Sequence, residues 1–252
     1  MGILKLALAA AAGGLAGVAN AMAGGGTLIT YPSLLLLGHG PIAANTTSTL
    51  ALWPGYVAAS FGFRPNLAGT RRVALILAWP SLAGGLTGAL LLLTTPAHLF
   101  QAVVPGLVFG ATLLLAWQGR SVERPAAPSL AGGRLAGAVA FQFAAGVYGG
   151  YFGGALGFLL LAGFGFFGMR DMLQMSGLKN LLTVLINGAA LVYFIVRSRV
   201  AWVDGLTMAA GAMAGGYAGA RLARRIGGAA VRRAVVVLGF AVSAGLLVKA
   251  LA

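Results

Sequence analysis

The sequence has no cysteine and very few residues that carry acid–base or metal chemistry. Its 252 residues include only three acidic side chains and two histidines. Without cysteine, the chain has no disulfide framework, thiolate metal site or haem-attachment motif. The acidic residues Glu123, Asp171 and Asp204 all lie away from the centres of the long apolar runs, which excludes the carboxylate relay of a typical intramembrane proton pump. No nucleophile–base–acid set and no metal-ligand cluster is visible, so we expect neither an enzyme nor a bound metal or other cofactor.

Apolar residues dominate what is present. The chain is 60% hydrophobic and 8% charged, with a mean hydropathy of +0.94, whereas a soluble domain averages about 25% charged residues. Apolar runs long enough to cross a hydrocarbon core of about 30 Å, roughly 20 residues each, fill nearly the whole chain. We therefore expect an all-α polytopic membrane protein.

The few charged residues are mostly basic, and the formal net charge is +14. On a soluble protein such an excess suggests nucleic-acid binding. Here most arginines fall in short segments between apolar runs, where basic residues set the orientation in the membrane and contact anionic headgroups. We therefore expect membrane lipid, and not nucleic acid, as a partner.

One stretch, residues 20–55, is apolar but interrupted. Three consecutive glycines, Gly24, Gly25 and Gly26, break it, and Pro54-Gly55 is expected to loosen its second helix. Irregular backbone at membrane depth survives only where protein or a wet cavity covers it. The polar residues that follow the break therefore predict an internal site: Thr27, Asn45, Thr46, Thr47 and Ser48.

The second half of the chain repeats the pattern of this stretch. Residues 143–157 match 13–27, with Gly153-Gly154 opposite Gly24-Gly25, and residues 176–188 match 43–55. Lys179 then lies opposite Thr46, and Asn180 opposite Thr47. We expect two transmembrane repeats, 1–118 and 131–252, joined by the polar linker 119–130. Each has about four hydrophobic segments, the first a glycine-broken helix or helical hairpin.

The repeats are parallel if each broken segment crosses once, and inverted if each is a hairpin that enters and returns. The inverted arrangement leaves only four basic residues outside: Lys5, Arg197, Arg199 and Lys249. Its cytoplasmic side holds Arg64, Arg71, Arg72, Arg120, Arg124, Arg134, Arg170, Arg221, Arg224, Arg225, Arg232 and Arg233. The parallel arrangement gives a smaller excess, so loop charge favours inversion.

Lys179 is the one cation inside an apolar run. A charge at bilayer depth is costly and points to function, although a lysine this near a helix start can also snorkel to the interface. We favour function, because Asn180 adjoins Lys179 and the N–H groups freed at the breaks suit an anion. The predicted substrate-binding residues are Gly24, Gly25, Gly26, Thr27, Asn45, Thr46, Thr47, Gly153, Gly154, Lys179 and Asn180. Asn20, Tyr148, Tyr151 and Asn187 either line the cavity or pack against it.

The order of these motifs resembles the TauE/SafE family of sulfite exporters, also called the 4-toluene sulfonate uptake permease family. The likeness covers essentially the whole chain and rests on residues 23–26 with Tyr31-Pro32, 44–48 with 53–55, 149–154 and 177–180. It implies a bacterial inner-membrane transporter for small sulfur oxyanions or organosulfonates.

We accordingly expect a multi-pass exporter of such anions that works by alternating access between the two repeats. A passive anion channel, an importer and a non-transporting membrane scaffold subunit remain alternatives. The coupling ion stays open, since hydroxyls and carbonyls can bind sodium, and so does a homodimer.

Overall fold

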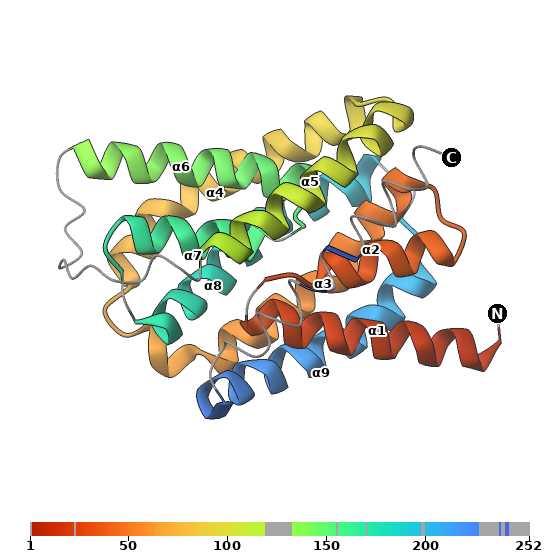
Figure 1. The fold of residues 1–252 in the computed structure, drawn as a ribbon, viewed down its shortest axis with the longest axis horizontal. Coiled ribbons are helices and arrows are strands. Elements are labelled where there is room, and N and C mark those ends of the chain that lie inside the picture. Colours follow the sequence, from red (N-terminus) through yellow and green to blue (C-terminus); the bar gives the residue numbers. More distant parts are fainter. Residues whose placement is uncertain are drawn as a thin grey trace.

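The computed structural model describes residues 2–22, 24–118, 133–154, 156–169, 171–197 and 200–226, with the single residues 237, 240 and 241. These residues are almost entirely helical and contain no strand (Figure 1). The helices are α1 (Ile3–Met22), α2 (Thr27–Leu36), α3 (Pro41–Gly62), the short 3-10 helix η1 (Arg64–Leu67), α4 (Arg71–Thr94), α5 (Ala97–Gln118), α6 (Gly133–Tyr151), α7 (Leu156–Phe166), α8 (Met172–Arg197) and α9 (Trp202–Ile226). The predicted linker 119–130, and residues 231–251 apart from the three single positions, lie outside the described part.

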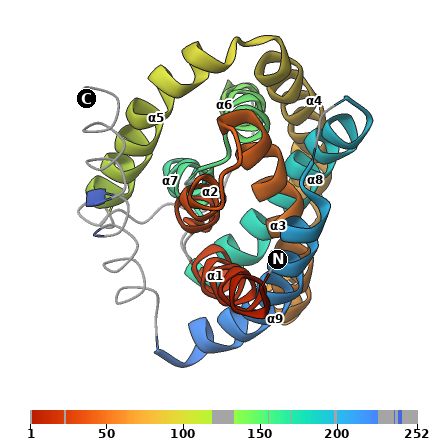
Figure 2. The ribbon, with the colours of Figure 1, turned by 90° about the vertical axis from the view of Figure 1, so that its right-hand side faces the viewer.

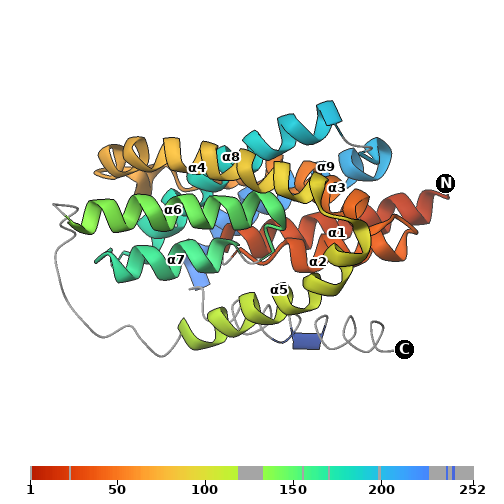
Figure 3. The ribbon, with the colours of Figure 1, turned by 90° about the horizontal axis from the view of Figure 1, so that it is seen from above.

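The helices form one bundle whose members run along a common long axis (Figures 1 and 3). Helices α1, α4 and α8 are long and apolar enough to cross a membrane, judged by length and composition. The protein is thus a multi-pass, all-α membrane protein, as the composition predicts.

Two helical hairpins enter the bundle from opposite ends. Helix α1 starts at the end marked N, and α2 returns toward that end, whereas α6 starts at the far end and α7 returns there (Figure 1). Both hairpins turn at a glycine with a left-handed backbone, Gly24 (φ 101°) and Gly153 (φ 72°). Glycine adopts this conformation with little steric cost, which explains why the chain breaks at these two positions.

Helices from the two halves of the chain pack on one another in matched pairs. The contact of α1 with α9 corresponds to that of α6 with α4, and the contact of α3 with α9 corresponds to that of α8 with α4. Small residues let the backbones of membrane helices approach closely. Glycines supply most of that small surface: Gly13, Gly17, Gly211 and Gly215 between α1 and α9, and Gly84, Gly88, Gly146 and Gly150 between α4 and α6.

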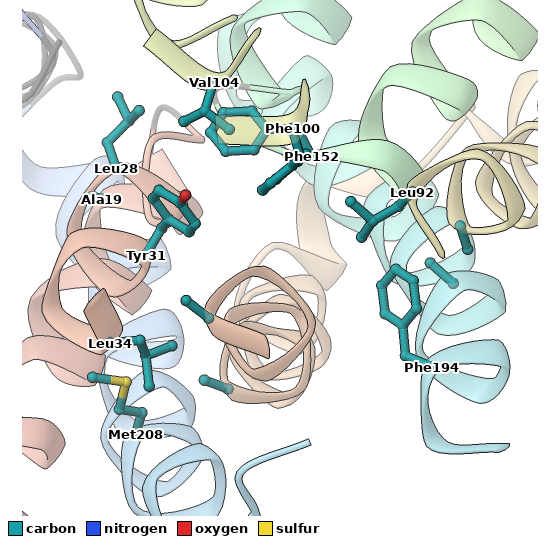
Figure 4. Packing of buried hydrophobic residues seen from close by; sticks show 14 of the residues in the cluster. Ala19, Leu28, Tyr31, Leu34, Leu92, Phe100, Val104, Phe152, Phe194 and Met208 are labelled. Atoms are coloured by element: carbon teal, nitrogen blue, oxygen red, sulfur yellow. The ribbon is translucent and has the colours of Figure 1, made fainter. Parts of the chain in front are cut away.

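A cluster of aromatic side chains covers the second break. Tyr31 of α2 packs edge-on against Phe152, with ring centroids 5.8 Å apart, and against Phe100 of α5 at 6.4 Å. Figure 4 shows these rings close to one another, with Val104 beside Phe100 and Leu28 beside Tyr31. All three rings are buried, so the irregular backbone that follows α6 is shielded from lipid.

The described basic side chains are concentrated at one end of the bundle, called here the basic end. It is the end where α3 and α9 finish and where α4, α6 and α8 begin (Figure 1). Exposed side chains there are Arg64, Arg71, Arg72, Arg221 and Arg225. The opposite end carries Lys5 of α1 and Arg197, the last residue of α8.

One local expectation is not met in α3. The helix continues without interruption through Pro54 and Gly55 to Gly62. Membrane helices tolerate an internal proline where neighbours cover it. Here Gly55 lies directly against the backbone of Ala212 in α9.

Candidate functional site

The two short helices α2 and α7 lie end to end, with their first turns meeting in the middle of the bundle (Figures 1 and 3). Viewed along the bundle, they overlap in its interior (Figure 2). At the junction, Gly24 contacts the backbone of Gly157 so closely that a Cβ on Gly24 would collide with it. Helix N-termini carry partial positive charge, so this arrangement directs two positive dipole ends toward one region.

Lys179 lies seven residues after the start of α8 at Met172 and is completely buried. Its Nζ donates hydrogen bonds to the carbonyl oxygens of Asn20 at 2.6 Å and Ala21 at 3.3 Å. These carbonyls belong to the last turn of α1, just before the glycine break. The side chain therefore points inward and does not snorkel to the interface.

Asn180 binds the same helix end. Its Nδ2 donates to the carbonyl of Ala21 at 3.2 Å and to that of Ser176 at 2.9 Å. Its Oδ1 is buried and has no hydrogen-bond partner among the described residues. Lys179 and Asn180 thus hold the carboxyl end of the broken helix α1.

Asn45 makes the corresponding contact at the other break. Its Nδ2 donates to the carbonyl of Tyr151, the last residue of α6, at 3.0 Å. Its Oδ1 is likewise buried and unpaired within the described structure. Side chains from α8 therefore bind the end of α1, and a side chain from α3 binds the end of α6. Each broken helix is held by the other half of the chain.

Asn20 links the break to its surroundings. Its Oδ1 accepts the N–H of Gly26 at 2.6 Å, which satisfies one free donor near the start of α2. Its Nδ2 has no partner among the described residues, and the side chain of Tyr56 lies against those of Asn20 and Asn187. Asn20, Asn187 and Tyr56 therefore lie together beside Lys179 and Asn180, and these five residues are called here the polar cluster. Tyr56 was not predicted from the sequence.

The other predicted site residues are engaged elsewhere. Thr46 donates to the carbonyl of Ala43 at 3.2 Å within its own helix, and Thr47 accepts the N–H of Ala201 at 3.0 Å, before the start of α9. Tyr148 donates its hydroxyl to the carbonyl of Gly154. Tyr151 packs its ring on Phe100, with centroids 5.7 Å apart. These residues shape the surroundings of the breaks, and the hydrogen bonds of the Lys179 Nζ go to Asn20 and Ala21 instead.

The remaining predicted positions are backbone elements of the breaks. Gly25 offers its carbonyl to the N–H of Leu28, and Gly26 offers its own to Ile29 and Thr30. Thr27 is the first residue of α2 and is buried. The carbonyl of Gly153 accepts the N–H of Leu156, which is the first residue of α7.

Two further polar contacts were not predicted from the sequence. The hydroxyls of Thr30 in α2 and Ser48 in α3 share a hydrogen bond of 2.5 Å. His39, in the turn after α2, places Nε2 2.7 Å from Oδ2 of Asp204 in the first turn of α9. The sequence does contain a hint of the contact between His39 and Asp204, because each of these residues lies at the end of an apolar run.

The electrostatics of the site are unusual. Lys179 has no salt-bridge partner among the described residues, and Asp204 is hydrogen-bonded to His39 instead. The same part of the chain holds no group of three metal-ligating side chains. The end of α1 therefore gathers the buried Lys179, the Nδ2 of Asn20 and the Oδ1 of Asn180, and the two amide atoms have no hydrogen-bond partner among the described residues. Such a set can bind one small anion, and a proton on that anion would suit the free oxygen.

Comparison with known proteins gives consistent matches over the chain. Residues 9–246 match a family described as sulfite exporter TauE/SafE. A "Probable membrane transporter protein" of Haemophilus influenzae is 28% identical over 251 residues, covering 97% of this chain and 95% of that protein. "Probable membrane transporter protein YfcA" of Escherichia coli strain K12 is 29% identical over 240 residues, covering 92% and 86%. No solved structure matches the chain significantly.

Proposed function

The chain belongs to the TauE/SafE family of sulfite exporters, and we propose that this membrane transporter carries small sulfur-containing oxyanions, such as sulfite or organosulfonates, out across a bacterial inner membrane. Its relatives are named as membrane transporters, so the substrate and the direction are the proposed part.

The observation that supports an anionic substrate is the uncompensated burial of Lys179. The side chain is fully buried, and its hydrogen bonds go to two neutral carbonyls. Burying an unpaired ion costs several kcal/mol, and removing one partner of a buried pair is strongly destabilising. An anion that enters beside Lys179 and the N-termini of α2 and α7 offsets this cost and so binds at this position.

The closed state of the cluster favours a carrier over a permanently open channel. Asn20, Asn45, Lys179 and Asn180 are each at most 2% exposed, so an anion can reach them only after helices move. We propose that the repeats 1–118 and 131–252 are inverted and rock against each other. The opposed entry of the two hairpins (Figure 1) supports that arrangement.

Outward movement needs no carboxylate relay. An inside-negative potential supplies about 2.3 kcal/mol per elementary charge per 100 mV. A divalent anion gains roughly twice that free energy on leaving the cell. The membrane potential alone can therefore drive export from a site that holds a cation and no described acidic residue.

The test is flux of labelled sulfite and of organosulfonates in proteoliposomes with imposed potentials. Wild-type protein should move net negative charge and respond to the sign of the potential. Lys179→Ala should reduce flux by about tenfold or more, as expected for a hydrogen bond to a charged group. Lys5→Ala, which alters an exposed lysine of α1, should leave flux unchanged.

The outcomes separate the parts of the proposal. Flux that ignores the potential would remove the electrogenic mechanism, and unchanged flux in Lys179→Ala would remove the site. Unitary conductance steps in planar bilayers would replace the carrier by a channel. No flux for any of these anions would leave the substrate assignment without support.

A further inference from the structure

Helices α3 and α9 enclose an apolar groove on the outside of the bundle. Its volume is about 510 Å³, and α3 lines it with Trp53, Pro54, Val57, Ala58 and Phe61. Helix α9 contributes Ala210, Met213, Ala214 and Tyr217. No residue of this groove belongs to the polar cluster around Lys179, so its function is separate from the substrate site.

The close crossing of the two helices explains the hollow. Gly55 of α3 and Ala212 and Gly216 of α9 bring the two backbones into direct contact. Larger side chains on either side then stand apart and form walls. Phe61, Met213 and Tyr217 are 66%, 53% and 44% exposed, so the groove faces the lipid and not the bundle interior.

The groove has a polar boundary at only one end. Trp53 lies at the inner end and donates its indole N–H to the carbonyl of Val184 at 3.0 Å. Phe61 comes eight positions after Trp53 in α3, a rise of about 12 Å. At the Phe61 end, the guanidinium of Arg221 lies over the ring of Tyr217, with Cζ 5.0 Å from the centroid.

Further positive charge surrounds this end. Gly62 packs against Ala220 and Tyr217, and the exposed Arg64 follows two residues later. Arg225 is exposed one turn beyond Arg221. Asp204 is hydrogen-bonded to His39 in the turn after α2. Asp171 caps the start of α8 by accepting the N–H groups of Leu173 and Gln174, and no salt bridge joins it to these arginines among the described residues.

We propose that the groove binds an anionic phospholipid, with one acyl chain between α3 and α9 and the phosphate at Arg221. Basic pockets between membrane helices on the cytoplasmic side suit anionic headgroups, and the positive-inside rule assigns the basic end to that side. A second copy of this chain in the same membrane orientation would bring two sets of arginines together, so charge favours the lipid.

The experiment measures lipid binding to the purified full-length protein in detergent by native mass spectrometry. The probes are phosphatidylglycerol and phosphatidylcholine with identical acyl chains. Phosphatidylglycerol should bind saturably at one site and phosphatidylcholine should not. Arg221→Gln should lower the apparent affinity for phosphatidylglycerol about fivefold, the effect of one basic residue near an anionic surface. Arg71→Gln, an exposed arginine at the same end but away from the groove, should change it little.

A second pair of variants tests the acyl-chain site. Ala214→Phe fills the groove and should abolish the saturable binding, whereas Ala83→Phe adds the same ring at an exposed position of α4 and should not. Equal binding of both lipids would overturn the proposal, as would equal losses in Arg221→Gln and Arg71→Gln. Dimers that Ala214→Phe dissociates, without loss of bound phosphatidylglycerol, would assign the groove to a second copy.

Discussion

The Nζ of Lys179 in α8 lies 2.6 Å from the carbonyl oxygen of Asn20 in α1, and the side chain of this asparagine also accepts the N–H of Gly26. One buried cation thus holds the end of a helix that leads directly into the first glycine break. Lys179 and the glycine break are therefore in direct structural contact. The effect of substituting Lys179 and the effect of substituting a glycine of the break can each be measured.

Replacing Lys179 by methionine should leave a folded protein that no longer responds to anions. Methionine keeps much of the buried volume and relieves the cost of burying an unpaired ion, which offsets the loss of the hydrogen bonds to the carbonyls of Asn20 and Ala21. At 100 times its Kd, sulfite should stabilise the wild type by about 2.7 kcal/mol and Lys179→Met hardly at all. Thermal unfolding in detergent, with and without sulfite, measures this difference. Equal stabilisation of both proteins would place the anion elsewhere.

Replacing Gly24 by alanine should be far more damaging than the same change at Gly38. Both glycines have positive φ, 101° and 93°, and an L-residue in left-handed backbone costs about 1–2 kcal/mol. A Cβ on Gly24 would also collide with the backbone of Gly157, whereas one on Gly38 meets nothing within 4 Å. The unfolding midpoint should therefore fall much further for Gly24→Ala. Similar decreases for both variants would show that contact between the two breaks adds nothing.

Replacing Asn45 by leucine should destabilise the protein by about 1–3 kcal/mol, the cost of leaving a buried polar group unpaired. The group left without its donor is the carbonyl of Tyr151 at the end of α6. Thr87→Val is the control, because it removes an exposed hydrogen bond to Ala83 within one helix. The free energy of unfolding in a denaturant series distinguishes them. A loss confined to Thr87→Val would contradict the role of Asn45.

The contact between His39 and Asp204 should restrain opening at the end of the bundle opposite the arginines. It joins the turn after α2 to the first turn of α9. Because the chain has no cysteine, Ser48→Cys provides a single buried thiol two turns into α3 from this end. Adding Asp204→Ala should raise its labelling rate by a membrane-impermeant thiol reagent about fivefold, the effect of losing about 1 kcal/mol from a partly exposed pair. A rate unchanged by Asp204→Ala would assign the pair no part in opening.

Much of the helical framework can be predicted from the sequence, because long apolar runs identify membrane-spanning helices. The break expected at Gly24–Gly26 separates α1 (Ile3–Met22) from the short α2 (Thr27–Leu36). The glycine runs correctly indicated breaks, because positive φ at Gly24 and Gly153 is a property of the residue type. The opposed hairpins and matched helix contacts agree with inverted repeats, which stay a prediction.

The direction in which each polar side chain points was much harder to predict from the sequence. Residues 45–48 are all buried, yet successive residues of a helix point about 100° apart and cannot share one face. Asn45 consequently reaches the end of α6, Thr47 faces the start of α9 and Ser48 bonds to Thr30. Only the packing of α3 against several helices decides which partner each of these side chains reaches.

The cross-connection of the two breaks has a consequence for biosynthesis. The carbonyl of Asn20 in the last turn of α1 accepts a hydrogen bond from Lys179, 159 residues further along the chain. Asn45 donates to the carbonyl of Tyr151, 106 residues further along. While the ribosome is still adding the second half, the end of the first helix lacks the donors of Lys179 and Asn180. Long-range contacts of this kind slow folding, so the nascent protein depends on the insertion machinery or water to satisfy that end until α8 arrives.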